Sequence, residues 1–137
     1  MSIAVIGAGM AGAACAKALT EQGIEVAVFD KGRSAGGRMS SKRTGRGYLD
    51  LGAQYFTARN DAFIEQCHIL ANTGSIACWE GLLAAWEAGG VSRSPDDTER
   101  YVGVPAMQAP VVQLLENISL HTGMQIDRLQ FEGACWL

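Results

Sequence analysis

The chain begins with a glycine-rich turn between two apolar runs, and this unit constrains the fold more than any other stretch. The apolar run 3–6 is followed by Gly7-Ala8-Gly9-Met10-Ala11-Gly12, then by an alanine-rich segment and a second apolar run that ends at Asp30. Short apolar runs separated by a turn and a helix-forming segment are typical of a βαβ unit. The sequence therefore predicts two parallel strands joined by one helix.

The spacing of the glycines predicts a dinucleotide site at this turn. Gly7 permits a tight turn at the strand end, Gly9 lets backbone N–H groups approach a pyrophosphate, and Gly12 lets the helix pack against the strand. The helix N-terminus then presents free N–H groups and a positive dipole end to the phosphates. Met10, within the glycine turn, and Ala11, which begins the predicted helix, are further predicted cofactor contacts. The alternative is that the glycines only shape the turn.

Asp30 is placed to bind a ribose. It ends the second predicted strand and lies 30 − 12 = 18 residues after Gly12. This spacing is typical of a carboxylate that accepts hydrogen bonds from an adenosine ribose. A 2′-phosphate would be repelled by the carboxylate, so an unmodified ribose is expected.

A glycine-containing basic loop follows over residues 31–43 and is expected to lack regular structure. Gly36 and Gly37 would bring its backbone close to a ligand, and Arg38 could form charge-assisted hydrogen bonds to a pyrophosphate. The alternative is a solvated loop. The loop also carries the cations Lys31, Arg33, Lys42 and Arg43.

These motifs resemble the flavin amine oxidase superfamily. The resemblance rests on the turn 7–12, on Asp30-Lys31 and on Gly36-Gly37-Arg38-Met39. The segment 49–59, with Gly52-Ala53-Gln54-Tyr55-Phe56-Thr57, is more specific and is similar to the bacterial renalase-like proteins. The similarity continues through Val102-Gly103-Val104-Pro105 and covers the chain. Ala106 and Pro110 depart from the family pattern, and Pro110 requires a place in the first turn of its helix.

The resemblance implies FAD as cofactor, bound by the residues named above, with Lys31 and Gly37 among them. It places Gly52-Ala53-Gln54-Tyr55 at the isoalloxazine ring, and these residues offer close backbone approach, an amide and an aromatic ring. An ordinary buried turn is the alternative for this stretch. It also places the backbone of Ile126 at the adenine. Ser94 would be a substrate contact, for which a solvent loop is the alternative.

The predicted fold class is α/β, a Rossmann-type FAD-binding parallel sheet with helices and the start of a β-rich substrate-domain insertion. Residues 1–74 and 101–137 are assigned to the FAD-binding portion and 75–100 to the substrate-side region. Helices are expected over 11–20, 60–73 and 107–117, a polar loop over 91–100, and strands over 3–6, 25–29, within 75–90, over 101–105, 118–121 and 124–129, and from 134. Because the last strand ends without a turn or polar tail, we expect a piece of a longer protein.

Composition excludes several classes of function. The 137 residues carry a net charge of −3 without a long basic run, so nucleic acid is not an expected partner. No apolar stretch reaches the roughly 18 residues of a membrane span, and we expect a cytoplasmic protein. Cys15, Cys67, Cys78 and Cys135 show no metal-ligand spacing and are expected to be buried and reduced, with a disulfide or metal role as the alternative. Trp79 and Trp86 are expected in the core, with a substrate pocket as the alternative.

Three functions remain open. The resemblance implies an FAD-dependent oxidase that takes hydride from a dihydronicotinamide nucleotide and is reoxidised by O2 to give H2O2. The second is an amine oxidase with the same cofactor, and the third is a non-catalytic nucleotide-binding fragment. A dehydrogenase that uses NAD fits the Gly-Gly-Arg loop less well. No side chain stands out as a general base, and none is assigned a catalytic role or a metal.

Overall fold

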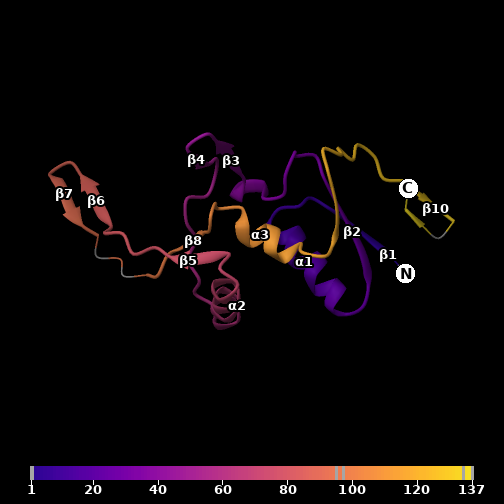
Figure 1. The fold of residues 1–137 in the computed structure, drawn as a ribbon, viewed down its shortest axis with the longest axis horizontal. Coiled ribbons are helices and arrows are strands. Elements are labelled where there is room, and N and C mark those ends of the chain that lie inside the picture. Colours follow the sequence, from indigo (N-terminus) through magenta and orange to yellow (C-terminus); the bar gives the residue numbers. More distant parts are fainter. Residues whose placement is uncertain (1, 95, 97, 134, 137) are drawn as a thin grey trace.

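The predicted βαβ unit forms one end of the molecule in a computed structural model, which describes residues 2–94, 96, 98–133 and 135–136 (Figure 1). Strand β1 (Ser2–Ile6) leads into helix α1 (Met10–Glu21) and strand β2 (Glu25–Asp30). β1 and β2 pair in parallel, from Ser2 opposite Glu25 to Ile6 opposite Phe29. β9 (Ser119–Thr122) adds in parallel to the other edge of β2, so the strand order is β1-β2-β9. The predicted parallel α/β sheet is confirmed.

Helix α1 ends in the way that its sequence predicts. The Gly23 N–H donates to the Thr20 carbonyl (2.9 Å), and the Ile24 N–H donates to the Leu19 carbonyl (3.1 Å). Gly23 has φ = 75°, a left-handed conformation that glycine adopts without a steric penalty. This pair of hydrogen bonds satisfies two carbonyls at the helix end and turns the chain into β2.

The middle of the chain forms a second, smaller unit. Helix α2 (Asp61–Asn72) begins where predicted, because the Asn60 side chain accepts hydrogen bonds from the Ala62 and Phe63 N–H groups.

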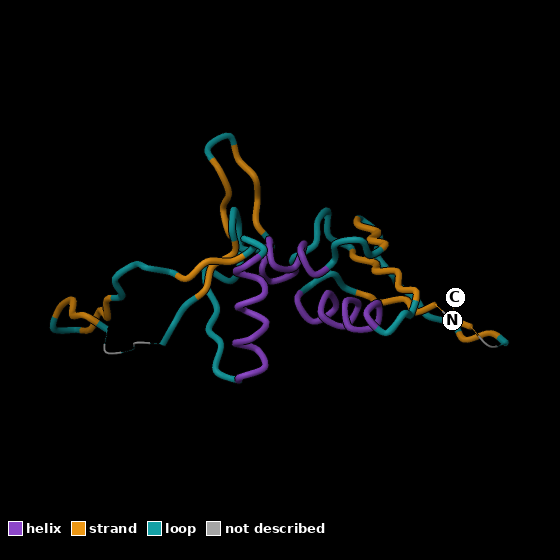
Figure 2. The backbone as a smooth tube through the Cα atoms, turned by 60° about the horizontal axis from the view of Figure 1, so that its bottom comes forward, coloured by secondary structure: helices purple, strands orange, loops and turns teal. Residues whose placement is uncertain are grey.

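The remaining strands form antiparallel pairs, and the hairpins β3–β4 and β6–β7 project from the body in Figure 2. These strands are β3 (Ser41–Thr44), β4 (Gly47–Asp50), β5 (Ile76–Cys78), β6 (Ala84–Glu87), β7 (Gly90–Arg93), β8 (Tyr101–Gly103), β10 (Phe131–Glu132) and β11 (Cys135–Trp136).

Several boundaries differ from the sequence-based expectation. Residues 41–43 of the predicted loop belong to β3, because a turn at 45–46 lets them pair with β4. Residues 91–93 belong to β7 for a similar reason, since they pair with β6. The predicted helix 107–117 is limited to α3 (Ala109–Leu114), with Pro110 in its first turn as required. It ends early because the chain reverses at Asn117, where φ = 64°, in order to enter β9.

The strand predicted over 124–129 is wrong. The Gly123 N–H donates to the Gly32 carbonyl (2.7 Å) and the Met124 N–H donates to the Asp30 carbonyl (2.9 Å). These bonds bend the chain away from the sheet, and within the described residues the segment pairs with no strand. The last predicted strand appears in part as β11, which pairs with the unexpected β10, while Ala134 and Leu137 lie outside the described residues.

Two clusters of buried side chains stabilise the two units. The first joins α1, β2 and α3 through Ala13, Ala16, Val28, Val111 and their neighbours. The second joins α2, β5 and β8 through Cys67, Leu70, Ile76 and Tyr101. The side chain of Leu114 packs on both clusters and so connects the two units.

Other side chains expected in the core are exposed. Cys67 is buried, but Cys15, Cys78 and Cys135 are exposed, and all four are free thiols. Trp79 is 41% exposed and Trp86 is 80% exposed. Trp79 directly follows β5 and Trp86 lies on β6, and they are exposed because each of these strands pairs with a single strand among the described residues. Within the described part of the chain, no helix has the length and apolarity needed to cross a bilayer.

The close packing of α1 on the glycine turn yields a stability prediction. A Cβ at Gly12 would lie 1.9 Å from the Gly7 carbonyl oxygen. We expect Gly12→Ala to lower the free energy of unfolding in urea by about 1–3 kcal/mol, although alanine by itself favours a helix by about 1 kcal/mol. Gly45→Ala is the control, since nothing lies within 4 Å of a Cβ there. A more stable Gly12→Ala variant would contradict this packing.

Candidate dinucleotide site

Three segments that are distant in sequence meet at the C-terminal end of β1. The Gly7 N–H donates to the Phe29 carbonyl (2.7 Å), which holds the turn against β2. The Gly36 N–H donates to the Ala8 carbonyl (2.8 Å), and Gly9 and Gly36 form a parallel bridge. The glycine turn and the Gly-Gly-Arg loop therefore lie in direct contact, as a shared phosphate site would require.

The third segment docks on the Arg38 carbonyl. The Ala53 N–H donates to it (2.8 Å), and a Cβ at Gly52 would lie only 2.2 Å from the same oxygen. Position 52 therefore has no room for a side chain. The structure places residues 52–53 directly against the basic loop, while for the Arg38 side chain it records no hydrogen bond or ion pair among the described residues.

Asp30 has a role that the sequence did not reveal. Its Oδ2 accepts a hydrogen bond from the Ala8 N–H (2.6 Å), and its Oδ1 accepts one from the Gly32 N–H (2.6 Å). The carboxylate thus ties the glycine turn to the start of the basic loop. A carboxylate has about four acceptor positions, so each oxygen retains one for a ribose hydroxyl.

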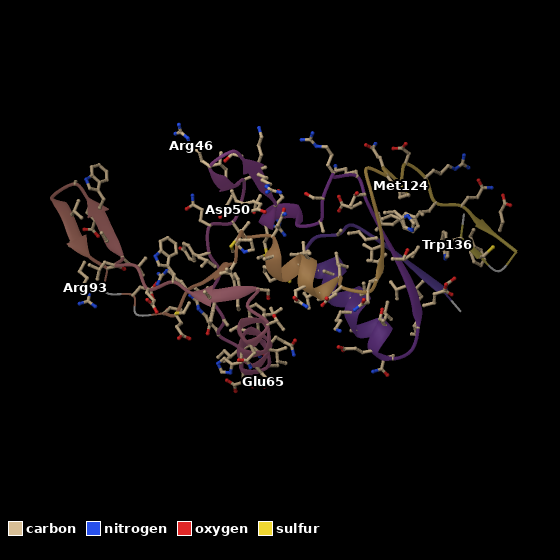
Figure 3. The ribbon with its side chains drawn as sticks, in the orientation of Figure 1. Arg46, Asp50, Glu65, Arg93, Met124 and Trp136 are labelled. Atoms are coloured by element: carbon tan, nitrogen blue, oxygen red, sulfur yellow. The ribbon has the colours of Figure 1, made fainter. Side chains whose placement is uncertain are left out.

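A cavity of about 830 Å³ lies beside these segments. Of the predicted cofactor residues, Gly7, Asp30, Lys31, Gly37 and Ile126 line it. Ile126 reaches it because of the bend after β9, near the labelled Met124 in Figure 3. Four cations also line it, and none of them forms an ion pair in the described part of the chain: Lys31, Arg33, Lys42 and Arg43.

The N-terminus of α1 borders the same turn. Gly9 is the N-cap residue, no side chain caps the helix, and no acidic residue lies in its first turn. Met10, Ala11 and Gly12 form that first turn. The N–H groups of this first turn therefore have no capping side chain and remain available to an acceptor, with the Asp30 carboxylate nearby on the Ala8 N–H.

The remaining predicted site residues lie elsewhere. The Tyr55 ring meets the Trp79 ring edge to face (centroids 5.9 Å apart), and the Arg100 guanidinium lies over the Tyr55 ring at 5.3 Å. Ser94 lies at the base of the β6–β7 hairpin, where its N–H donates to the Leu83 carbonyl (2.9 Å). Gln54 is exposed. Tyr55 and Ser94 thus belong to the second unit and not to the 830 Å³ cavity.

Arg100 is a buried charge that no sequence motif singled out. Its Nη2 lies 2.6 Å from Asp96 Oδ2, and its Nη1 donates to the Thr98 carbonyl (2.8 Å). Hydrogen bonds from Thr98, followed by one from Arg100, lower the pKa of Asp96 to about 2. Nearby, the hydrogen bond with Glu99, together with burial, raises the pKa of Tyr101 to about 12. With these pKa values Asp96 is ionised and Tyr101 is neutral near neutral pH.

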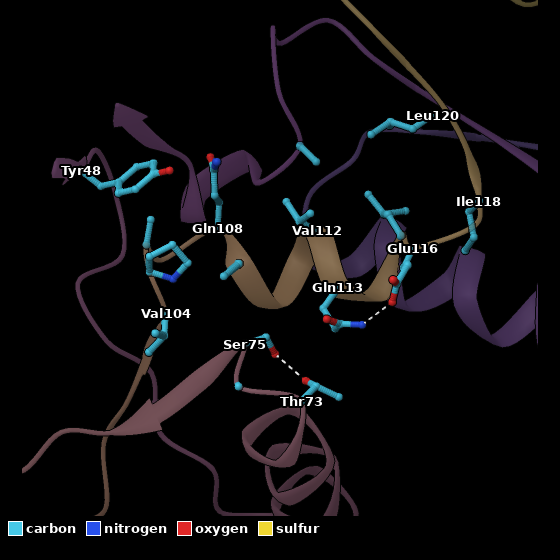
Figure 4. A pocket seen from close by; sticks show the side chains of 16 residues that line it. Tyr48, Thr73, Ser75, Val104, Gln108, Val112, Gln113, Glu116, Ile118 and Leu120 are labelled. Carbon is cyan, nitrogen blue, oxygen red and sulfur yellow. Dashed lines mark hydrogen bonds between the residues drawn. The ribbon is translucent and has the colours of Figure 1, made fainter. Parts of the chain in front are cut away.

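A different cavity, of about 610 Å³, lies along α3 and has mainly apolar walls such as Val104 and Val112 (Figure 4). The hydrogen bonds drawn as dashed lines in Figure 4 join Thr73 to Ser75 and Gln113 to Glu116. None of the predicted cofactor residues lines it. It therefore lies apart from the glycine turn.

Comparison with known proteins supports the nucleotide-binding assignment. Residues 5–66 match the family described as NAD(P)-binding Rossmann-like domain. A 52-residue stretch is 44% identical to 4,4′-diapophytoene desaturase (4,4′-diaponeurosporene-forming) of Staphylococcus aureus strain Newman, which is 38% of this chain and 10% of that protein. The chain therefore spans about a tenth of the length of the curated relatives it matches.

Solved structures agree with the fold. Cyclohexylamine oxidase from Brevibacterium oxydans IH-35A has a TM-score of 0.51 and 29% identity, over 70% of this chain and 22% of that one. An oxidoreductase from Methanosarcina mazei has a TM-score of 0.61 over 96% of this chain and 53% of its own, and at 13% identity it supports the fold alone.

The similarities agree with the nucleotide-binding turn and the α/β fold that the sequence predicts. They do not single out the renalase-like proteins. Residues 5–66, somewhat less than half of the chain, are therefore similar to an NAD(P)-binding Rossmann-like domain.

Proposed function

We propose that this chain binds FAD as part of an FAD-dependent oxidoreductase. The observation that carries the proposal is the meeting of three backbone segments, around Gly7, Gly36 and Gly52, beside a cavity lined by four cations that form no ion pair with another described residue. A pyrophosphate needs N–H donors and positive charge, and the α1 N-terminus and the basic loop offer both. The residues therefore fit the cofactor that the superfamily implies.

The assignment of residues follows the geometry. Gly7, Gly9, Met10, Ala11 and Gly12 would bind the pyrophosphate through the turn and the helix start. Asp30 would bind the ribose, and the backbone near Ile126 would hold the adenine. Lys31, Gly37 and Arg38 would contact the phosphates from the basic loop. Residues 52–55 lead away from this end of the cavity and would carry the ring-side contacts.

The substrate side belongs to the same proposal. When bound, FAD supplies hydride uptake from a reduced substrate and transfer of two electrons and a proton to O2, which with one solvent proton forms H2O2. The chain's own residues would bind and orient both molecules. We assign 1–74 and 101–137 to cofactor binding and 75–100, with Ser94, to the substrate side. A dihydronicotinamide nucleotide is the proposed substrate, on the resemblance to renalase-like proteins, and the proposed location is cytoplasmic.

An amine oxidase is the second candidate, favoured by the similarity to cyclohexylamine oxidase. Both reactions release H2O2, so a peroxide assay distinguishes their substrates. We expect peroxide with isomers of reduced nicotinamide nucleotide and not with primary amines such as cyclohexylamine. Peroxide formation with amines alone would favour the second candidate. FAD binding without turnover of either class would favour a non-catalytic nucleotide-binding fragment.

Cofactor binding is the first test. The purified chain should retain a yellow flavin, with absorbance maxima near about 370 and 450 nm. In titrations of flavin-free protein, FAD should bind at least about tenfold more tightly than FMN, because only FAD carries the adenosine half that Asp30 and residue 126 would contact. NAD should bind more weakly than FAD. Failure to bind FAD in such a titration would overturn the proposal.

Asp30 provides a more specific test. Asp30→Asn removes the charge and one acceptor, and we expect FAD affinity to fall about 10- to 100-fold, the size of one or two hydrogen bonds to a charged group. Asp61→Asn on the exposed start of α2 is the matched control and should leave FAD affinity unchanged. The effect of the substitution on FMN affinity distinguishes ribose binding by Asp30 from support of the glycine turn. An equal loss for FMN would indicate that Asp30 only supports the turn.

A further inference from the structure

The positive charge of the chain is concentrated in one short segment. Residues 31–49 hold six of the 11 Lys and Arg residues and none of the 14 Asp and Glu residues. Because the whole chain has a net charge of −3, the rest of it carries −3 − 6 = −9. A negatively charged surface would therefore attract this segment and repel the remainder, which orients the molecule. The six cations are Lys31, Arg33, Arg38, Lys42, Arg43 and Arg46.

A dinucleotide would not use up this charge. None of the six cations forms an ion pair with another described residue. A pyrophosphate brings about one negative charge per phosphate, so bound FAD would leave most of the six without compensation. Arg46, in the turn of the β3–β4 hairpin, does not line the 830 Å³ cavity. The surplus of positive charge can therefore serve a second, larger anionic partner.

The β3–β4 hairpin, which carries three of the cations, projects from the body as a well-defined ribbon (Figure 2). At its base the Ser41 hydroxyl donates to Asp50 Oδ1 (2.7 Å). At its far end the Thr44 hydroxyl donates to the Gly47 carbonyl (3.0 Å), which closes the turn that presents Arg46 (Figure 3). The ribbon is therefore fixed at both ends, and its side chains are held in place before a partner arrives.

Both faces of the ribbon combine a cation with an apolar side chain. Arg43 lies opposite Tyr48, and Lys42 lies opposite Leu49. Directly opposed residues share a face of a two-stranded ribbon, so each face carries one such pair. All four residues are exposed, with 40% of Tyr48 and 58% of Leu49 accessible. The two apolar side chains would gain stability from transfer into an apolar layer.

A lipid surface suits this ribbon better than a protein does. A protein, or a second copy of the chain, that docked on one face would leave the apolar side chain of the other face in water. The interface of an anionic membrane would surround both faces, because basic residues bind the headgroups while apolar side chains insert by about 5–10 Å. The strands are long enough for this depth, with four residues each at a rise of about 3.4 Å.

We propose that the β3–β4 hairpin docks the chain on an anionic phospholipid surface. Arg46 and the neighbouring cations Lys42 and Arg43 bind the headgroups, while Tyr48 and Leu49 insert at the boundary with the acyl chains. The contact is with the membrane surface and involves no membrane span. It does not depend on FAD binding.

Vesicle binding tests the proposal in the full chain. The probes are vesicles of phosphatidylcholine alone and vesicles of equal parts phosphatidylcholine and phosphatidylglycerol. We expect saturable co-sedimentation with the anionic vesicles, with at least about tenfold weaker binding to the neutral ones. An increase in salt from about 0.1 M to about 1 M should weaken the binding strongly, because it shortens the range of the electrostatic attraction about threefold.

Variants identify the residues responsible. Arg46→Gln removes one charge at the turn and should weaken vesicle binding about fivefold, the effect of one basic residue near an anionic surface. Leu49→Ser should weaken it about tenfold through lost apolar burial, at low and at high salt. Arg93→Gln and Val91→Ser, on the exposed strand β7 of the other projecting hairpin, are the matched controls and should change nothing. Unfolding in urea checks that every variant is folded.

Several results would overturn the proposal. They are absence of binding to anionic vesicles, equal binding to neutral vesicles, full affinity in a folded Arg46→Gln/Leu49→Ser variant, and an equal loss in the two β7 variants. Self-association that Leu49→Ser abolishes, without vesicle binding, would instead indicate a second copy of the chain as the partner. Saturating FAD provides a last check, because vesicle binding that FAD abolishes would mean that the headgroups only occupy the dinucleotide site. Vesicle binding is measured first without FAD, so a failure to bind FAD leaves this test intact.

Discussion

The Asp30 carboxylate holds the nucleotide-binding end of the molecule together. Its two oxygens accept hydrogen bonds from the N–H groups of Ala8, in the turn after β1, and Gly32, in the loop after β2. The Asp30 carbonyl also accepts the Met124 N–H, which directs the chain after β9 past the same cavity. One residue thus positions the glycine turn, the basic loop and the segment that contains Ile126. Its negative charge also offsets part of the positive charge of the loop.

A second polar junction connects this end to the rest of the chain. Asp50 Oδ1 accepts hydrogen bonds from the Ser41 hydroxyl (2.7 Å) and the Met107 N–H (3.1 Å). Gln108 Oε1 accepts the Ser41 N–H (3.2 Å). The base of the β3–β4 hairpin is therefore fixed to the start of α3, which packs on α1. The basic residues at 42–43 are held near the cavity by this junction as well as by their own loop.

The sequence predicted the helices and turns whose ends are determined by residues only a few positions away. The turn 7–12, the Asn60 cap, the Gly23 end of α1 and Pro110 in the first turn of α3 all depend on residues within a few positions of one another. The failures involve long-range partners. Residues 41–43 are a strand only because residues 47–50 return beside them, and 124–129 alternate in polarity but pair with none of the described strands. Arg100 had no local signal, because its burial depends on Tyr55, some 100 − 55 = 45 residues earlier.

The glycines of the site differ in what they imply about a ligand. At Gly12 and Gly52 a Cβ would lie 1.9 and 2.2 Å from backbone atoms, so packing alone requires glycine there, and at Gly37 the φ of 55° favours glycine. Gly9 is different. Its φ of −83° is open to any residue, and its Cβ would meet nothing closer than 3.8 Å. The fold does not require glycine at this position, whereas a pyrophosphate lying against the backbone would. Gly9 is therefore the glycine of the motif that argues for a bound dinucleotide and not merely for a βαβ turn.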